Sequence, residues 1–112
     1  MRKALVIGIN KYDQNPLKFC INDAKCVGEI LEKNGSGSPN FEVVFKYDIK
    51  TSAELLSIII SFFSGQCDTA LLYFAGHGYF TNIGGYILST DLQMGVSMNE
   101  LLTITNQSPI TN

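Results

Sequence analysis

The stretch LLYFAGHGYF, residues 71–80, contains the only histidine of the 112-residue chain, His77, between two glycines. Histidine can accept and return a proton near neutral pH, as a general base must. Gly76 would permit a sharp exit from a strand, and Gly78 would leave its backbone N–H uncovered and able to donate to an oxyanion beside the imidazole. A tight turn without a chemical role explains the three residues equally well, because a Gly-His-Gly motif is short.

The chain has three cysteines, Cys20, Cys26 and Cys67. Their number is odd and they lack the paired Cys-x-x-Cys spacing of a zinc site, so we expect free thiols that mostly fill the core. Cys20 is the one expected near His77, but its loop contains nothing else that would activate a thiol. We therefore expect no metal site at these cysteines, and we do not favour Cys20 as a nucleophile.

Composition and charge exclude several classes of function. The formal net charge is −2 and the basic residues are scattered, so neither nucleic acid nor a membrane surface is an expected partner. The first strand is followed by neither Gly-x-Gly-x-x-Gly nor a P-loop, so we expect no nucleotide and no cofactor. The longest apolar run, LLSIIISFF at 55–63, is too short to cross a bilayer, and the amino-terminal segment has no signal-peptide cleavage site. We therefore expect a cytoplasmic protein.

Three segments have the pattern of strands. KALVIGI at 3–9 and TALLYFA at 69–75 are continuous apolar runs, typical of strands buried on both faces. FEVVFKY at 41–47 alternates as a strand does. The segment YFTNIGGYILS, 79–89, reads as a short hairpin that turns at 82–85.

Helical periodicity marks the segments 22–35, 51–63 and 97–106, the first of which is expected to end at Gly35. Strand and helix thus alternate, which predicts a doubly wound, mainly parallel α/β sheet with right-handed crossovers. The expected N-caps of the three helices are, in chain order, Asn22 or Asp23, Thr51 with Glu54, and Ser97 with Glu100.

In open parallel sheets, functional residues gather at the carboxyl ends of the strands. His77 directly follows the third strand, while Cys20 and Asp23 close the long loop after the first. We therefore expect His77 at this edge, partly exposed and within one loop of Cys20 and Asp23.

Several segments in register, ALVIGINKY, LKFCINDAKCVGEIL, ALLYFAGHGYF and GYILSTD, resemble the caspase-like cysteine peptidases. The resemblance is greatest to the metacaspase and bacterial caspase-homologue branch and runs from Lys3 to about Asn106. It implies a caspase–haemoglobinase fold with strand order 2-1-3 plus a short hairpin. It also implies a His–Cys dyad that cleaves polypeptides.

By this resemblance, His77 is the dyad histidine and the Gly78 N–H is half of the oxyanion hole. Asp23 matches the position that gives the metacaspase S1 pocket its acidic wall, which selects Arg or Lys at P1. Cys20 lies in the same substrate-binding region, where metacaspase-like sequences often have a cysteine that is not the nucleophile. The alternative role for Asp23 is the helix N-cap, and one carboxylate could serve both.

Caspases proper select aspartate with an arginine in this first loop. Here the loop has only Lys11 and Lys18 as basic residues, which disfavours cleavage after aspartate.

The sequence departs from the family pattern in one respect. The family's nucleophile lies in a D-x-C-x-S-G segment after the helix at 97–106, and the 112 residues contain no such segment. We interpret residues 1–112 as the amino-terminal half of a single caspase-like domain. A complementing C-terminal segment or chain would supply the cysteine, and the chain alone is expected to be inactive.

Two further expectations follow. Asp91 lies where many metacaspases bind calcium, but one carboxylate cannot supply the roughly six to eight oxygen ligands that calcium takes, so we expect no metal. The strand at 69–75 would lack its neighbour and would tend to pair with another chain, so we expect the isolated chain to be an oligomer, an aggregate, or stable only with its complementing segment.

Four functions stay open at this point. The chain is half of an endopeptidase, an inactive homologue that acts by binding a partner, an incomplete or degraded gene product, or an unrelated small α/β binding module.

Overall fold

The computed structural model describes residues 1–82, 84–93 and 95–110. Its main sheet is parallel and has the strand order β2-β1-β3, which confirms the predicted caspase-like α/β arrangement. The three strands are β1 (Arg2–Gly8), β2 (Phe41–Tyr47) and β3 (Thr69–Ala75).

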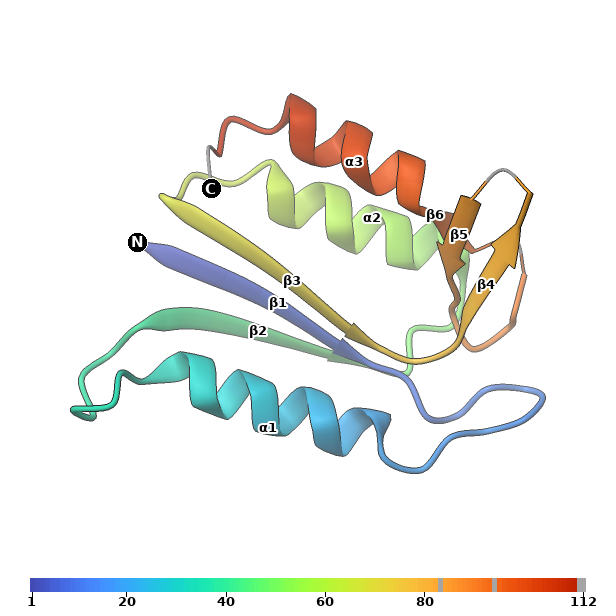
Figure 1. Ribbon diagram of the computed structural model, residues 1–112, viewed down its shortest axis with the longest axis horizontal. Coiled ribbons are helices and arrows are strands. Elements are labelled where there is room, and N and C mark those ends of the chain that lie inside the picture. Colours follow the sequence, from blue (N-terminus) through green and yellow to red (C-terminus); the bar gives the residue numbers. More distant parts are fainter. Residues whose placement is uncertain (83, 94, 111–112) are drawn as a thin grey trace.

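Three helices cover the two faces of this sheet: α1 (Cys20–Glu32), α2 (Ser52–Phe63) and α3 (Met98–Gln107). Figure 1 shows α1 on one side and the pair α2 and α3 on the other. Each crossover between parallel strands thus places its helix against the sheet, as a doubly wound fold requires.

The central strand β1 is buried on both faces because its side chains alternate between two hydrophobic cores. Leu5 and Ile7 pack with α2 and α3, whereas Ala4 and Val6 pack with Ala24 of α1. The continuous apolar run in the sequence therefore reflects two cores that share one strand.

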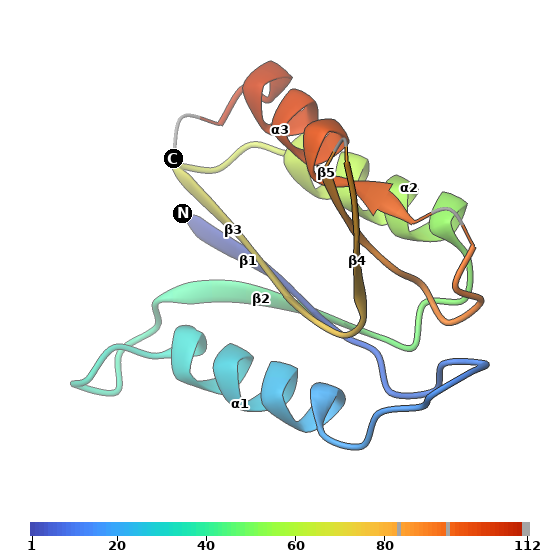
Figure 2. The same ribbon diagram turned by 45° about the vertical axis from the view of Figure 1, so that its right-hand side comes forward.

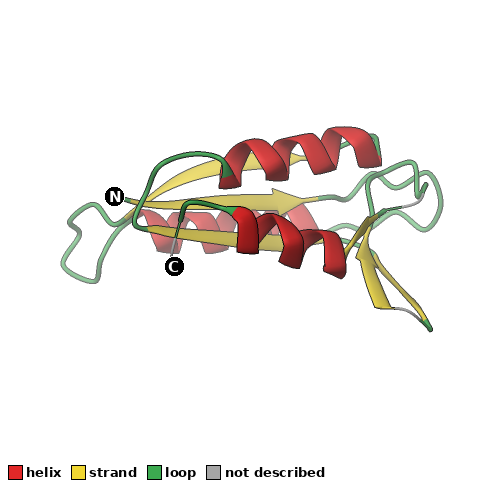
Figure 3. Ribbon diagram, turned by 90° about the horizontal axis from the view of Figure 1, so that it is seen from above, coloured by secondary structure: helices red, strands yellow, loops and turns green. Residues whose placement is uncertain are grey.

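A second, antiparallel sheet follows His77 in the order β4-β5-β6. It confirms the predicted hairpin, although Ile83 in its turn lies outside the described residues. Figure 3 shows the hairpin projecting from the end of the main sheet toward which the strands point. The strands are β4 (Gly78–Thr81), β5 (Gly84–Ile87) and β6 (Val96–Ser97).

The caps of the second and third helices agree with the predictions. The Thr51 hydroxyl accepts from the Glu54 N–H at 3.1 Å. Ser97 and Glu100 form a complete capping box.

The predicted cap of the first helix is wrong. α1 begins at Cys20, two residues early, with Phe19 as N-cap and no capping side chain at that position, so Asn22 and Asp23 lie inside the first turn. The helix also ends at Glu32, before Gly35. The reason for the early start is a capping group from outside the helix, described below.

Within the described residues, no helix is both long enough and apolar enough to cross a membrane.

Candidate active site

The carboxyl ends of the parallel strands lie at one end of the molecule, together with the loops that follow them (Figure 1). His77 follows β3 directly, the segment 9–19 follows β1, and the segment 48–51 follows β2. The hairpin β4–β5 begins at the same end, as the rotated view in Figure 2 shows. Segments far apart in the sequence thus meet around His77.

His77 is half-buried, and its ring is held by the loop after β1. Its Nε2 lies 2.7 Å from the carbonyl oxygen of Asn15. A carbonyl oxygen only accepts hydrogen bonds, so Nε2 carries the proton and the lone pair lies on Nδ1. Asn15 has a left-handed φ of 52°, a conformation that asparagine tolerates better than most residues. The neutral imidazole can therefore accept a proton at Nδ1.

The backbone N–H of Gly78 points away from the hairpin. In an antiparallel pair, hydrogen-bonded residue pairs alternate with pairs that are not hydrogen-bonded. Leu88 N–H donates to the His77 carbonyl at 3.2 Å, so the next pair, Gly78 with Ile87, is not hydrogen-bonded. Gly78 is also exposed. Its N–H is therefore available to a group beside the His77 ring.

Gly76 is a glycine because of the space around it. A Cβ at this position would overlap the Tyr12 hydroxyl and come within 2.9 Å of the Phe74 ring. Its backbone is not in the left-handed region, so the sharp strand exit that the sequence suggested is not what requires glycine here.

Tyr12 contacts His77 although the sequence analysis did not single it out. The side chain is buried, the Tyr12 hydroxyl accepts from the His77 backbone N–H at 2.7 Å, and the same hydroxyl donates to the Leu88 carbonyl at 2.8 Å. Burial raises the pKa of Tyr12 to about 12, with smaller effects of the same sign from Cys20 and Asp48 and an opposing one from the His77 hydrogen bond. The phenol therefore stays protonated at neutral pH.

Asn10 is the second residue that the sequence analysis missed, and it supplies the missing cap of α1. Its Oδ1 accepts from the backbone N–H groups of Cys20 at 2.9 Å and Ile21 at 3.2 Å. These are the unpaired N–H groups at the start of a helix that an N-cap normally satisfies. The cap comes from the end of the first strand, ten residues upstream, and so joins the strand to the helix.

Asp48 holds the same loop from the other side. Its Oδ1 accepts from the backbone N–H of Asn10 at 2.8 Å and of Lys11 at 3.1 Å. The signal that could have identified Asn10 and Asp48 is their position, since each lies within two residues of the carboxyl end of a parallel strand.

Cys20 and Asp23 lie in the first turn of α1, at the same end of the sheet. Cys20 is half-buried and Asp23 is exposed. Burial raises the pKa of the Cys20 thiol, and the negative charge of Asp23 raises it further. Cys20 therefore favours the thiol form, which is a poor nucleophile.

Residues 1–110 match the sequence model of the caspase domain family. The chain belongs to the caspase domain family. A search of curated proteins gave no significant match. Family membership excludes the unrelated α/β binding module, and it implies a cysteine peptidase family whose substrates are polypeptides.

The other two cysteines of this caspase-family chain lie on α1 and before β3. Cys26 is exposed on α1. Cys67 precedes β3 at the amino end of the sheet, and its thiol lies 3.4 Å from the Thr69 carbonyl oxygen, to which it donates. The fold thus places the Cys67 thiol and the imidazole at opposite ends of β3.

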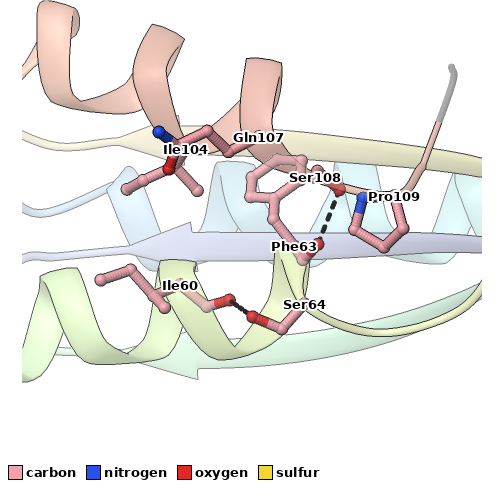
Figure 4. Close-up of a pocket in the computed structure, with 7 residues that line it drawn as sticks. All are labelled: Ile60, Phe63, Ser64, Ile104, Gln107, Ser108 and Pro109. Atoms are coloured by element: carbon pink, nitrogen blue, oxygen red, sulfur yellow. Dashed lines mark hydrogen bonds between the residues drawn. The ribbon is translucent and has the colours of Figure 1, made fainter.

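One hollow, lined in part by apolar side chains, lies away from the caspase-family site. A cavity of about 250 Å³ lies between the C-terminal turns of α2 and α3, at the opposite end of the sheet (Figure 4). Its wall is closed by two hydroxyl bonds, from Ser108 to the Phe63 carbonyl at 2.6 Å and from Ser64 to the Ile60 carbonyl at 2.7 Å. Its side chains include no acid, base or thiol, so it offers no peptidase chemistry.

Asp91 has local partners. Its Oδ1 accepts from the Ser89 hydroxyl at 2.8 Å and from the Gln93 N–H at 3.1 Å. It lines a charged cleft of about 440 Å³ with Asp13 and Asp48. In the part of the chain that the structure describes, no three acidic, histidine or cysteine side chains are arranged to bind a metal ion.

Proposed function

We propose that this caspase-family chain supplies the dyad histidine, His77, and one oxyanion donor, the Gly78 N–H, to a cysteine endopeptidase of the metacaspase type. The observation that carries the proposal is which nitrogen of the His77 imidazole is left free to accept a proton. The bond from Nε2 to the Asn15 carbonyl leaves Nδ1 as a base, and the adjacent Gly78 N–H is turned outward. A base and an oxyanion donor on consecutive residues are what acyl transfer by a thiol requires.

The nucleophile in this proposal comes from a D-x-C-x-S-G segment that is not among these 112 residues. The properties of two cysteines support this, because Cys20 favours the thiol form and Cys67 lies at the opposite end of β3 from His77. The segment would occupy the open side of β3, since β3 is an edge of the described sheet. A groove of about 430 Å³ between β3 and α3, lined in part by Ala70, Leu72 and Leu101, runs along that edge.

We further propose that Asp23 selects Arg or Lys at P1. Its carboxylate is exposed on the first turn of α1 and lies close enough to Cys20 to affect the thiol. A carboxylate there would pair with a guanidinium or an ammonium group of the substrate. Cys20 would form part of the same pocket wall.

The experiment joins the 112 residues to a complementing segment with the D-x-C-x-S-G motif and measures turnover of peptides with Arg, Lys or Asp at P1. The sequence downstream of Asn112 is the first place to look for that segment. We expect cleavage after Arg and Lys, no turnover with His77→Ala, and no turnover by the 112 residues alone.

Asp23→Ala is expected to lower kcat/KM for basic P1 residues by about 100-fold or more, as for loss of one partner of a desolvated charge pair. Asp68→Ala, an exposed aspartate at the opposite end of the sheet, is the matched control and is expected to leave turnover unchanged. Efficient cleavage after Asp would contradict the assignment of Asp23. Full activity of His77→Ala would contradict the dyad.

The open edge of β3 also supports oligomer formation by the isolated chain, which light scattering at micromolar concentration measures. A strict monomer would contradict this part of the proposal.

A further inference from the structure

Tyr12 joins three segments through a single hydroxyl group. It belongs to the loop after β1, accepts from the backbone N–H of His77 at 2.7 Å, and donates to the carbonyl of Leu88, the residue after β5, at 2.8 Å. The side chain is only 3% exposed, so water cannot replace these partners easily. Each segment is thereby fixed relative to the other two.

The Tyr12 ring also limits where the imidazole can lie. The ring centroids of Tyr12 and His77 are 4.4 Å apart and the planes are inclined at 55°. Asn15, three residues further along the same loop, holds Nε2. The loop after β1 therefore holds His77 at its backbone, at one side of its ring and at one ring nitrogen.

Tyr12 has no proton to transfer in this arrangement. Its one hydroxyl proton is donated to Leu88, and its raised pKa keeps that proton in place at neutral pH. The phenol can neither act as a base toward His77 nor exchange protons with it. Its contribution is confined to geometry.

Gly76, which has no side chain, leaves the space that the Tyr12 hydroxyl occupies. Any side chain at position 76 would overlap the Tyr12 hydroxyl. The glycine before His77 and the tyrosine of the first loop are thus parts of one packing arrangement.

We infer that Tyr12 is a positioning residue for His77, which fixes the orientation of the imidazole and so the direction of the Nδ1 lone pair. The inference rests on the proposed role of His77 in proton transfer. A small misplacement of a reacting group lowers the reaction rate strongly, so the contact between Tyr12 and His77 would matter for catalysis.

The test uses the 112-residue chain and ¹⁵N-edited NMR, in which the only histidine gives a single set of ring signals. Tyr12→Phe keeps the aromatic ring and removes the hydroxyl. We expect the His77 Nε2–H to exchange with water about five- to tenfold faster than in the wild type, as for loss of one neutral hydrogen bond. Tyr73→Phe removes a hydroxyl on the α1 side of β3 and is expected to leave the exchange unchanged.

Gly76→Ala tests the same contact from the other side, because the added methyl group displaces the phenol while Tyr12 itself is retained. It is expected to accelerate the exchange in the same way. A folded Tyr12→Phe protein with wild-type exchange and wild-type ring ¹⁵N shifts would overturn the inference. If both variants unfold, the wild type decides: absence of nuclear Overhauser effects between the Tyr12 and His77 rings would overturn it.

These signals do not depend on turnover. Full activity of His77→Ala in the complemented peptidase would remove the proposed function and leave the NMR result intact. If His77→Ala is inactive in the complemented peptidase but Tyr12→Phe leaves the His77 NMR signals unchanged, only the positioning role of Tyr12 is contradicted.

Discussion

The two ends of the parallel sheet are built differently. At the carboxyl end, side chains bind backbone groups far away in the sequence, as Tyr12 does with His77 and Asp48 does with Asn10. At the amino end, Ser108 also bonds a distant backbone group, the Phe63 carbonyl, but the hydroxyl of Ser64 binds within its own helix and the long-range ion pair between the N-terminus and Asp68 is exposed. A hollow of about 250 Å³ between α2 and α3 lies at the amino end, yet the group able to act as a base is at the other end. In this molecule, the candidate base lies in a network of hydrogen bonds that joins the segments after β1, β2 and β3.

The largest expected difference between the two ends is in how much a glycine-to-alanine substitution lowers the free energy of unfolding. A Cβ at Gly8, at the carboxyl end of β1, would lie 2.8 Å from the Cys20 carbonyl oxygen and the Ile21 Cα, and backbone atoms cannot move aside easily. Gly8→Ala is therefore expected to lower the free energy of unfolding by about 3 kcal/mol, as for overpacking. Urea denaturation measures this.

The matched control is Gly65→Ala at the amino end, where the nearest atom to an added Cβ is the Phe62 carbonyl oxygen at 3.5 Å. We expect a change within about 0.5 kcal/mol. Equal effects at Gly8 and Gly65 would mean that the two ends are packed alike.

The second largest expected effect is a loss of folding stability at alkaline pH, caused by Tyr12 at the carboxyl end. The pKa of Tyr12 is about 12 in the folded protein and about 10 in an unfolded chain, so the unfolded state loses its proton first. Its contribution to stability is complete below pH 10, is lost as the pH rises toward 12, and amounts to about 2–3 kcal/mol. Tyr47 also has a raised pKa, but its side chain is 39% exposed and its contribution is smaller.

Denaturation at several pH values measures this loss. In Tyr12→Phe, the free energy of unfolding should depend less on pH between pH 10 and 12. As the pH rises, backbone hydrogen exchange should accelerate in the segments 9–19 and 76–80 at a lower pH than in the turns around Ser64 and Ser108. A wild-type curve in the Tyr12→Phe protein would show that another group controls the alkaline transition.

The smallest expected effect concerns the thiols. Burial, and secondly the charge of Asp23, raise the pKa of Cys20, so it should react with iodoacetamide at pH 7.5 more slowly than the exposed Cys26. Asp23→Asn should accelerate Cys20 by a small factor and leave Cys26 unchanged. Mass spectrometry of the alkylated peptides measures both rates. A Cys20 that reacts faster than Cys26 would identify an activated thiol beside His77 and reopen its role as a nucleophile.

Local patterns in the sequence predicted the main elements well. Two apolar runs and one alternating segment identified the three parallel strands to within one residue, and Ser97 with Glu100 identified the start of the last helix. These signals are local, because a strand buried on both faces must be apolar throughout and a helix must satisfy its first N–H groups nearby. The start of α1 was missed because its capping group is Asn10, which no rule of local spacing would select.

The sequence alone determined that His77 follows an apolar strand, that Gly78 is adjacent to it, and that the chain has the segments of a caspase domain in order. The expected burial of that strand on both faces is wrong for the described residues, since β3 is a half-buried edge strand. Only the tertiary structure decided which ring nitrogen of His77 carries the proton, because that depends on the Asn15 carbonyl, 62 residues away. It alone also brought Tyr12 and Asn10 into the site. The physical reason is that a hydrogen bond depends on distance and direction in space, and those are set by how the parallel strands align their carboxyl ends.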